Sequence, residues 1–205
     1  MEFFDVVRTQ RAMRRLLPDP VSDEDLWTIL DAAIHAPSGG NTQGWNFLVI
    51  RDAATKEKIA GWYLDAWNKV YGPRREGMLE DERQGRMFKS ADYLANHLAE
   101  APVLIIAALQ NRTGMGTDIS HGGSIYPAVQ NLMLAARALG LGTTLTTLHR
   151  LHERELKELL GIPQEVDTMA LIPLGHPRGK FGEPARVPAE KVTYWERWGE
   201  RRERA

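Results

Sequence analysis

The chain has 205 residues, of which 43% are hydrophobic and 26% charged, with a formal net charge of −1. This composition is typical of a globular protein long enough to bury a sizeable core, and the near-zero charge argues against a strong nucleic-acid partner. The absence of cysteine excludes disulfides, thiolate zinc sites and a cysteine nucleophile.

The first residues of the chain include acidic side chains and no long apolar stretch, so we expect no signal peptide. The longest aliphatic run, residues 103–109, is too short to span a bilayer. We therefore expect a cytoplasmic protein without a membrane partner. No internal repeat or low-complexity linker divides the sequence, which predicts one domain over residues 1–205.

The first clear helix is predicted over residues 23–35. Ser22 can cap its N-terminus, Asp25 stands at the third helical position, and apolar residues follow at helical spacing. Pro37 ends this helix. The run Phe47–Ile50 then predicts a buried strand.

The remaining elements alternate between helices and strands. Residues 71–84 are rich in charge and contain Gly and Pro, which predicts a mobile surface segment, and residues 110–123 are expected to form a loop. This alternation indicates an α+β or α/β class. Helices are predicted over residues 55–70, 91–100, 126–139 and 153–160, and strands over residues 103–109, 143–147 and 168–174.

Two motifs near the start of the chain indicate a binding site. The first is the basic cluster Arg11-Ala12-Met13-Arg14-Arg15, and the second is the turn Ala36-Pro37-Ser38-Gly39-Gly40-Asn41-Thr42-Gln43-Gly44-Trp45. Guanidinium groups match phosphate geometry, and small residues let backbone amides approach a flat ring closely. Together the motifs favour a cradle for a phosphorylated aromatic cofactor. Alone, the first is typical of a solvated basic face and the second of a helix-to-strand turn.

Other kinds of site have less support. His149 and His152 are three residues apart, but no nearby acidic pattern completes a zinc site. Gly140-Leu141-Gly142 lacks the third glycine of a dinucleotide-binding fingerprint and follows a helix instead of a strand. We therefore expect no metal site.

The two motifs and three later ones resemble, in order, the signature of the nitroreductase superfamily, which binds FMN. Gln10–Arg14 resembles the element that holds the FMN phosphate and the pyrimidine side of the flavin, and Ala36–Trp45 resembles the Pro-Ser turn. Residues 127–142 resemble the central helix and its following turn. Leu145–Thr147 fall where the family places groups beside the flavin ring and N5, and Arg186–Pro188 resemble a late basic element that reaches the phosphate.

The resemblance implies an α+β fold with a mixed central sheet flanked by helices, in an intertwined homodimer with FMN at the subunit interface. It further implies hydride transfer from NADPH or NADH through flavin N5 to an electrophile such as a nitroaromatic or a quinone, without an obligatory side-chain acid or base. Residues 71–84 would be a lid, residues 181–205 a C-terminal extension, and Thr147 a donor to N5. The implied cofactor-binding residues are Gln10, Arg11, Ala12, Met13, Arg14, Pro37, Ser38, Gly39, Asn41, Leu145, Thr146, Thr147 and Arg186.

Three positions depart from the family pattern. Gln10 replaces an arginine, which removes a charge but keeps hydrogen-bond donors, and Ala12 replaces a serine. The division of the phosphate contacts among the neighbouring arginines is therefore open. Gly44 replaces a proline before Trp45, which predicts a looser turn.

Two narrower interpretations also stay open. Residues 37–40 and 145–147 are similar to the iodotyrosine deiodinase branch of the superfamily, where a threonine hydroxyl at N5 accompanies reductive dehalogenation. That branch uses a lid lysine before an Ala-Pro turn, and residues 95–102 contain no lysine. A non-catalytic protein that stores or senses FMN would have the same phosphate motif. Consumption of pyridine nucleotide distinguishes such a protein from a reductase.

Overall fold

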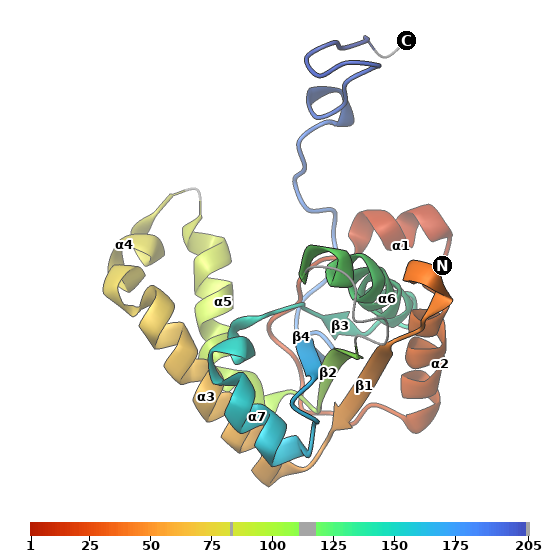
Figure 1. Cartoon of the computed structure of the whole chain (residues 1–205). Helices are drawn as coiled ribbons and strands as arrows, with labels where there is room; N and C mark the ends of the chain where they lie inside the picture. The colour runs from red at the N-terminus through yellow and green to blue at the C-terminus, as the bar shows by residue number, and fades with distance from the viewer. Residues whose placement is uncertain (83, 111–117, 204–205) are drawn as a thin grey trace.

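A four-stranded sheet in the order β1-β2-β4-β3 lies at the centre of the molecule (Figure 1). The computed structural model describes residues 1–82, 84–110 and 118–203. All three neighbouring strand pairs are antiparallel. Within the described residues, the parallel component of the expected mixed sheet is limited to one bridge between Ala12 and Thr143. The strands are β1 (Trp45–Ile50), β2 (Val103–Gln110), β3 (Gly142–Thr143) and β4 (Val166–Gly175).

Helices cover both faces of the sheet. Helices α2 and α6 pack on one face, and α3, α5 and α7 pack on the other. The α+β prediction is confirmed by this arrangement. The helices are α1 (Phe3–Thr9), α2 (Asp23–Ile34), α3 (Ala53–Tyr71), α4 (Arg75–Glu80), α5 (Gly85–His97), α6 (Asp118–Ala138) and α7 (Glu153–Leu160).

Strand β2 shows why this sequence forms a sheet with two covered faces. Successive side chains of a strand point to opposite faces. Leu104 and Ile106 accordingly pack with α3 and α5, whereas Val103 and Ile105 pack with α2 and α6. All four side chains are almost fully buried. A continuous apolar run, instead of an alternating one, is what such a central strand requires.

Helix α2 forms as its capping residues and apolar stripe predict. The Ser22 hydroxyl accepts a hydrogen bond from the Asp25 N–H at 3.0 Å, which satisfies one of the free donors at the helix N-terminus. Leu26, Ile29 and Ala33 are buried against α6 and the sheet.

Helix α6 is longer than predicted. It begins at Asp118, whereas the sequence predicts a loop up to residue 123; residues 111–117 of that loop lie outside the described residues. Gly122 and Pro127 disfavour helix in isolation, but α6 is packed between α2 and the sheet. A Cβ at Gly122 would lie 3.1 Å from the ring of Tyr126. Tertiary packing therefore favours helix where local propensity does not.

The predicted mobile segment at residues 71–84 is largely helical. A 3₁₀ turn (Gly72–Arg74) leads into α4, and α5 begins six residues before its predicted start. The Arg75 guanidinium donates two hydrogen bonds to the Asp92 carboxylate, at 2.8 and 2.7 Å. Helices α3, α4 and α5 together form an arm that projects beside the sheet (Figure 1).

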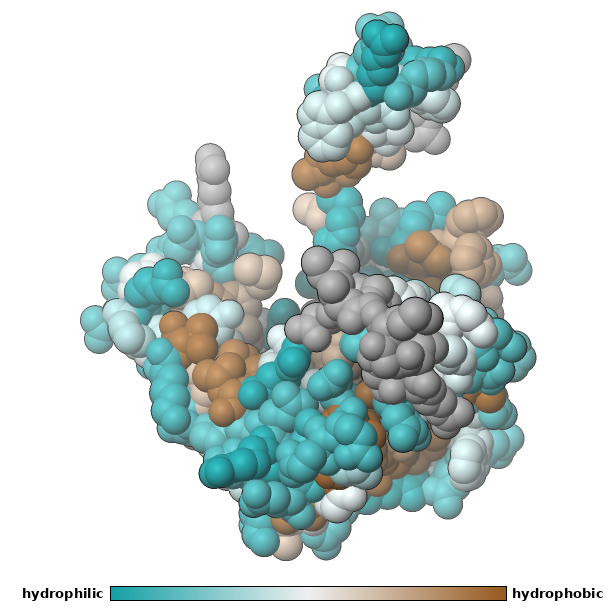
Figure 2. Space-filling view, in the orientation of Figure 1, coloured by the Kyte–Doolittle hydropathy of each residue, from teal (hydrophilic) through white to brown (hydrophobic). Residues whose placement is uncertain are grey.

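The C-terminal tail (residues 181–203) leaves the body beside Arg137 of α6. The Arg137 Nε donates to the Thr9 hydroxyl of α1 at 2.9 Å, and its guanidinium lies 4.0 Å from the centre of the Phe181 ring. Glu183 also pairs with Arg8 of α1 at 3.5 Å, and beyond this ion pair the tail extends away from the rest of the molecule (Figure 1). Exposed hydrophobic residues lie on the tail and on α1 (Figure 2), including Trp198, which is 89% exposed.

Candidate functional site

The basic segment (residues 10–17) runs along the β3 edge of the sheet. The Met13 N–H donates to the Thr143 carbonyl at 2.8 Å, and the Leu17 N–H donates to the His176 carbonyl at 2.7 Å. These bonds fix the backbone at both ends of the arginine cluster. The side chains of Met13 and Leu16 are buried under the segment. The arginines of the segment are therefore held on an ordered backbone.

Arg14 is a half-buried cation without an anionic partner. Within the described part of the chain, neither Arg14 nor the exposed Arg11 forms a hydrogen bond or an ion pair. Burial lowers the pKa of Arg14; Tyr63 opposes this shift and the charge of Arg11 adds to it. The guanidinium stays charged, since the reference pKa of arginine lies far above neutrality. Two neighbouring guanidinium groups without carboxylate partners, of which Arg14 is partly desolvated, suit a phosphate.

Arg15 has a different environment. Its guanidinium lies 4.6 Å from the centre of the Tyr93 ring. Tyr93 stacks in turn on His97, with ring centres 4.1 Å apart, and His97 contacts Glu100 at 2.7 Å. The Arg15 side chain is engaged by α5, which leaves Arg11 and Arg14 as the candidate phosphate ligands.

The threonine segment (residues 145–147) follows β3, whose Thr143 pairs with the basic segment at Ala12 and Met13. Both backbone groups of Thr146 pair with Leu171 of β4, at 3.0 and 2.9 Å, so they are not free to bind a ligand. Its hydroxyl lies 2.9 Å from the hydroxyl of Tyr63. Leu145 and Thr147 are exposed at the same place. Tyr63 was not among the predicted site residues; its only sequence signal is a hydroxyl-bearing residue in the apolar stripe of α3.

The Pro-Ser turn (residues 36–44) is stabilised by a hydrogen bond within the turn and by another to α6. The Ser38 hydroxyl accepts the Gln43 N–H at 3.1 Å, and the Gly39 N–H donates to the Ser124 hydroxyl at 3.2 Å. Gly40, Asn41 and Gln43 have positive φ values of 58°, 53° and 49°. Ser124 is a further residue that the sequence did not single out.

At Gly44, the last residue of this turn, the backbone lies close to Gln110, so the turn is tightly packed here and not loose as predicted. Its carbonyl accepts the Gln110 N–H at 2.8 Å and the Asn46 side-chain amide at 3.0 Å. A Cβ at Gly44 would collide with the Gln110 carbonyl oxygen. A glycine therefore suits this position because no side chain fits there.

The predicted site residues fall into three groups within one chain. Arg11, Arg14 and the threonine segment lie at the β3 edge, whereas the Pro-Ser turn leads into β1 at the opposite edge, with β2 and β4 between them. Adjacent strands are about 4.8 Å apart, so β1 and β3 are separated by roughly 14 Å. Arg186 is on the exposed tail, where its guanidinium contacts the Ala185 carbonyl.

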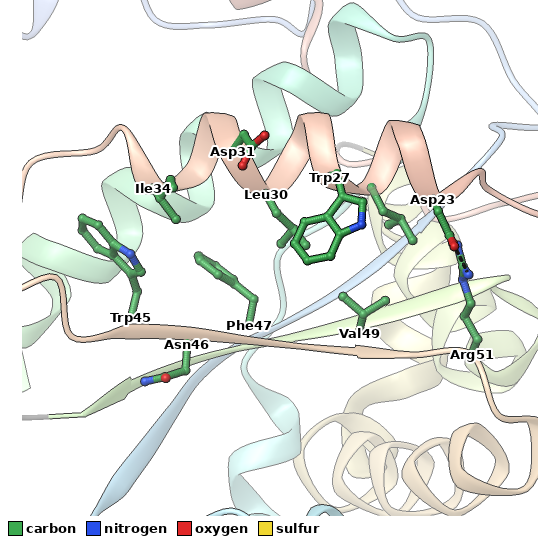
Figure 3. Close-up of a pocket in the computed structure, with 11 residues that line it drawn as sticks. Asp23, Trp27, Leu30, Asp31, Ile34, Trp45, Asn46, Phe47, Val49 and Arg51 are labelled. Atoms are coloured by element: carbon green, nitrogen blue, oxygen red, sulfur yellow. Dashed lines mark hydrogen bonds and ion pairs between the residues drawn. The ribbon is translucent and has the colours of Figure 1, made fainter.

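A groove of about 640 Å³ lies between α2 and β1, away from the basic segment. Trp27, Leu30 and Ile34 of α2 face Phe47 and Val49 of β1 across it (Figure 3). An ion pair between Asp23 and Arg51 closes one end. The lining of this α2–β1 groove is mainly apolar, although Asp31 and Asn46 also contribute to it, and the groove therefore differs in character from the arginine site.

Metal ligands do not gather in the described residues, where no group of three His, Asp or Glu side chains has suitable geometry. His149 is buried and donates from Nε2 to the Thr168 carbonyl, whereas His152 contacts Asp65 at 2.6 Å. None of the helices in the described ranges is both long and apolar enough to cross a membrane.

Residues 7–176 match the profile of the Nitroreductase family. The chain belongs to this family. The prediction from the five motifs is thereby confirmed.

Known relatives of the chain carry several activities. An NADH dehydrogenase of Thermus thermophilus is 25% identical, over 91% of this chain and 92% of its own. An iodotyrosine deiodinase of Thermotoga neapolitana is 27% identical, over 85% of this chain and 88% of its own. Among solved structures, a Desulfovibrio desulfuricans protein in complex with FMN matches with a TM-score of 0.69 and 27% identity, over 97% and 98% of the two chains. The chain therefore matches these relatives over most of their length.

Proposed function

We propose that this nitroreductase-family chain is an FMN-dependent oxidoreductase that takes hydride from NADPH or NADH and reduces an electrophile such as a nitroaromatic or a quinone. The observation that carries the proposal is Arg14, a half-buried cation without a counter-ion beside Arg11 and the threonine segment. A phosphate supplies the missing anion, and the small and hydroxyl-bearing residues nearby suit a flat polar ring. The FMN complex of the Desulfovibrio relative supports this choice of cofactor.

The residues of the β3 edge have separate tasks in this proposal. When bound, FMN supplies the hydride-accepting and hydride-donating chemistry. Arg11 and Arg14 bind its phosphate and pyrimidine side, and the fixed positive charge of Arg14 favours the more negatively charged reduced form. Thr146 and Thr147 offer hydroxyl groups to the ring. No side chain has to act as an acid or a base.

A second copy of the chain is part of the proposal. One chain holds the basic segment and the Pro-Ser turn at opposite sheet edges, so a site that uses both takes them from two subunits. We propose a homodimer in which the Pro-Ser turn, with Gly39 and Asn41, and the tail residue Arg186 come from the partner copy. The apolar α2–β1 groove and the exposed aromatic residues of the tail provide surface for this association. Light scattering after size exclusion tests it, and a monomer would contradict it.

The test of the activity is a visible spectrum of the full-length protein reconstituted with FMN. We expect a bound-flavin band that is bleached anaerobically by NADPH or NADH and restored by a nitroaromatic or a quinone. A bound flavin that neither nucleotide bleaches would favour a protein that stores or senses FMN. Failure to bind FMN would overturn the proposal.

Reductive dehalogenation is the second candidate, favoured by the Thermotoga relative and by the threonine segment. The missing lysine in residues 95–102 weighs against it. Residues 71–84, which include α4, are the proposed lid in either case. Incubation of the reduced protein with an iodinated tyrosine tests the alternative: we expect no iodide above a flavin-only control, whereas catalytic release would establish a deiodinase.

A further inference from the structure

The hydroxyl pair formed by Tyr63 and Thr146 joins α3 to the threonine segment. Tyr63 is 3% exposed, and its ring packs in the core beside the basic segment. Its oxygen lies 2.9 Å from the Thr146 hydroxyl oxygen. This is the one hydrogen bond of either side chain within the described residues. Each hydroxyl therefore determines the orientation of the other.

Thr146 is held by two independent sets of bonds. Its backbone pairs with Leu171 of β4, whereas its side chain pairs with Tyr63. Loss of the Tyr63 hydroxyl would leave the backbone bonds intact and release only the threonine hydroxyl. A Tyr63→Phe substitution can therefore separate the direction of the hydroxyl from the position of the segment.

Either hydroxyl of the pair can donate to the other, and burial distinguishes the two arrangements. Burial raises the pKa of Tyr63, and the Thr146 hydrogen bond and the Arg14 charge oppose this shift. The phenol is therefore neutral near pH 7, with its oxygen in the field of a cation. If the phenol accepted this bond, its own proton would be left unpaired in the core, since Tyr63 is 3% exposed and has no other hydrogen bond within the described residues. Donation by the phenol avoids this cost and leaves the proton of the partly exposed Thr146 free for a ligand.

We propose that Tyr63 is a positioning residue, which fixes the Thr146 hydroxyl as a hydrogen-bond donor to the bound flavin ring. The proposal rests on the proposed FMN function. It assigns the donor role to Thr146 in addition to the exposed Thr147. The hydrogen bond from Tyr63 polarises the Thr146 hydroxyl. A donor polarised in this way stabilises the reduced cofactor, which carries more negative charge.

The experiment compares the full-length variants Tyr63→Phe, Thr146→Val and the double variant after reconstitution with FMN. The readout is the ratio of the affinities for reduced and oxidised FMN, measured as the two-electron midpoint potential. Tyr126→Phe is the matched control, because it also removes a tyrosine hydrogen bond, to the Met169 carbonyl on the other side of the sheet. Circular dichroism and thermal unfolding show whether each variant is folded.

We expect Tyr63→Phe to bind oxidised FMN within about threefold of wild type and to lower the affinity ratio by about fivefold, which is about 20 mV for a two-electron couple. Thr146→Val should lower it at least as much, and the double variant no further than Thr146→Val alone. Tyr126→Phe should leave the ratio unchanged.

Three results would overturn the proposal and can be told apart. If wild type binds FMN but Tyr63→Phe has the same potential as Tyr126→Phe, Tyr63 supports the fold only. An additive shift in the double variant would also show that Tyr63 does not act through Thr146. If wild type binds no FMN, the proposed function fails, and the positioning role falls with it.

Discussion

At the β3 edge the sheet is bordered by the basic segment of its own chain, whereas no described strand pairs with the outer side of β1 at the opposite edge. The β3 edge holds unpaired positive charge on a fixed backbone. The β1 edge holds a mainly apolar groove, in which Asp23 and Arg51 pair with each other and Asp31 is the remaining charged lining residue. The first edge is thus suited to a small anionic ligand, and the second to another polypeptide. Four measurements can sharpen or refute this contrast.

Acidification should have the largest of the four effects, because it lowers the stability of the fold through a buried histidine next to the threonine segment. Burial lowers the pKa of His149, which follows the threonine segment, to about 4. Between pH 6.5 and 4 the unfolded chain binds a proton that the folded chain excludes, so stability is complete above pH 6.5 and falls as the pH drops. From pH 7.5 to 4.5 this single group should lower the free energy of unfolding by about 2.5 kcal/mol.

Urea unfolding at both pH values measures this loss. His149→Gln keeps an amide donor for the Thr168 carbonyl but does not titrate in this range. Its stability should therefore fall less on acidification, by about the contribution of one buried histidine. Equal losses in wild type and variant would show that His149 is not the group responsible.

Arg14→Ala should weaken FMN binding by about 2 kcal/mol, or roughly 30-fold, because a charge-assisted contact is lost. Arg15→Ala is the matched control, since the Arg15 guanidinium lies on Tyr93. Titration of the flavin fluorescence measures both. Equal losses of FMN affinity in the two variants would mean that Arg14 contributes no more to binding than Arg15. Arg186→Ala should also weaken binding if the partner's tail completes the site.

Gly44→Ala should lower the free energy of unfolding by about 1.5 kcal/mol, as overpacking does elsewhere. The added Cβ meets the Gln110 carbonyl oxygen at the start of β1. Gly39→Ala is the control in the same turn, because its Cβ would lie 3.9 Å from the Ser124 hydroxyl oxygen, an ordinary contact. Chemical denaturation compares the two. An equally stable Gly44→Ala variant would mean that the turn is not tightly packed.

Trp27→Ala should act on association and leave the monomer nearly unchanged, because the side chain is 66% exposed in one chain. If the α2–β1 groove is covered in a dimer, the dissociation constant should rise about tenfold. Leu151→Ala, which removes another exposed hydrophobic side chain outside this groove, is the control. Sedimentation at several concentrations gives both constants. An unchanged dissociation constant for Trp27→Ala would show that the groove is not part of the dimer interface.

Local signals in the sequence predicted the parts of the fold that depend on neighbouring residues. The Ser22 cap and the apolar stripe of α2 are of this kind. The start of α6 could not be predicted in the same way, because Gly122 and Pro127 disfavour helix until α2 and the sheet pack around them. The order within residues 71–84 depends on a contact between Arg75 and Asp92, which are 17 residues apart.

The candidate site shows the same limit. The family motif assigned Arg14 and not Arg15 to the cofactor, but the neighbouring residues alone gave no physical reason for this difference. The difference depends on Tyr93, far along the chain and on another helix. Tyr63 was missed for the same reason, since a tyrosine in an apolar stripe is most often a core residue.

The contact of Arg137 with Phe181 determines how the molecule would bear mechanical force. A pull on the tail would load the Glu183–Arg8 ion pair and then this contact before it reached Gly175 at the end of β4. Because the same guanidinium also holds Thr9, the load passes into α6 and α1 together. Tension on the tail would therefore be borne first by helices α1 and α6 and only afterwards by the sheet.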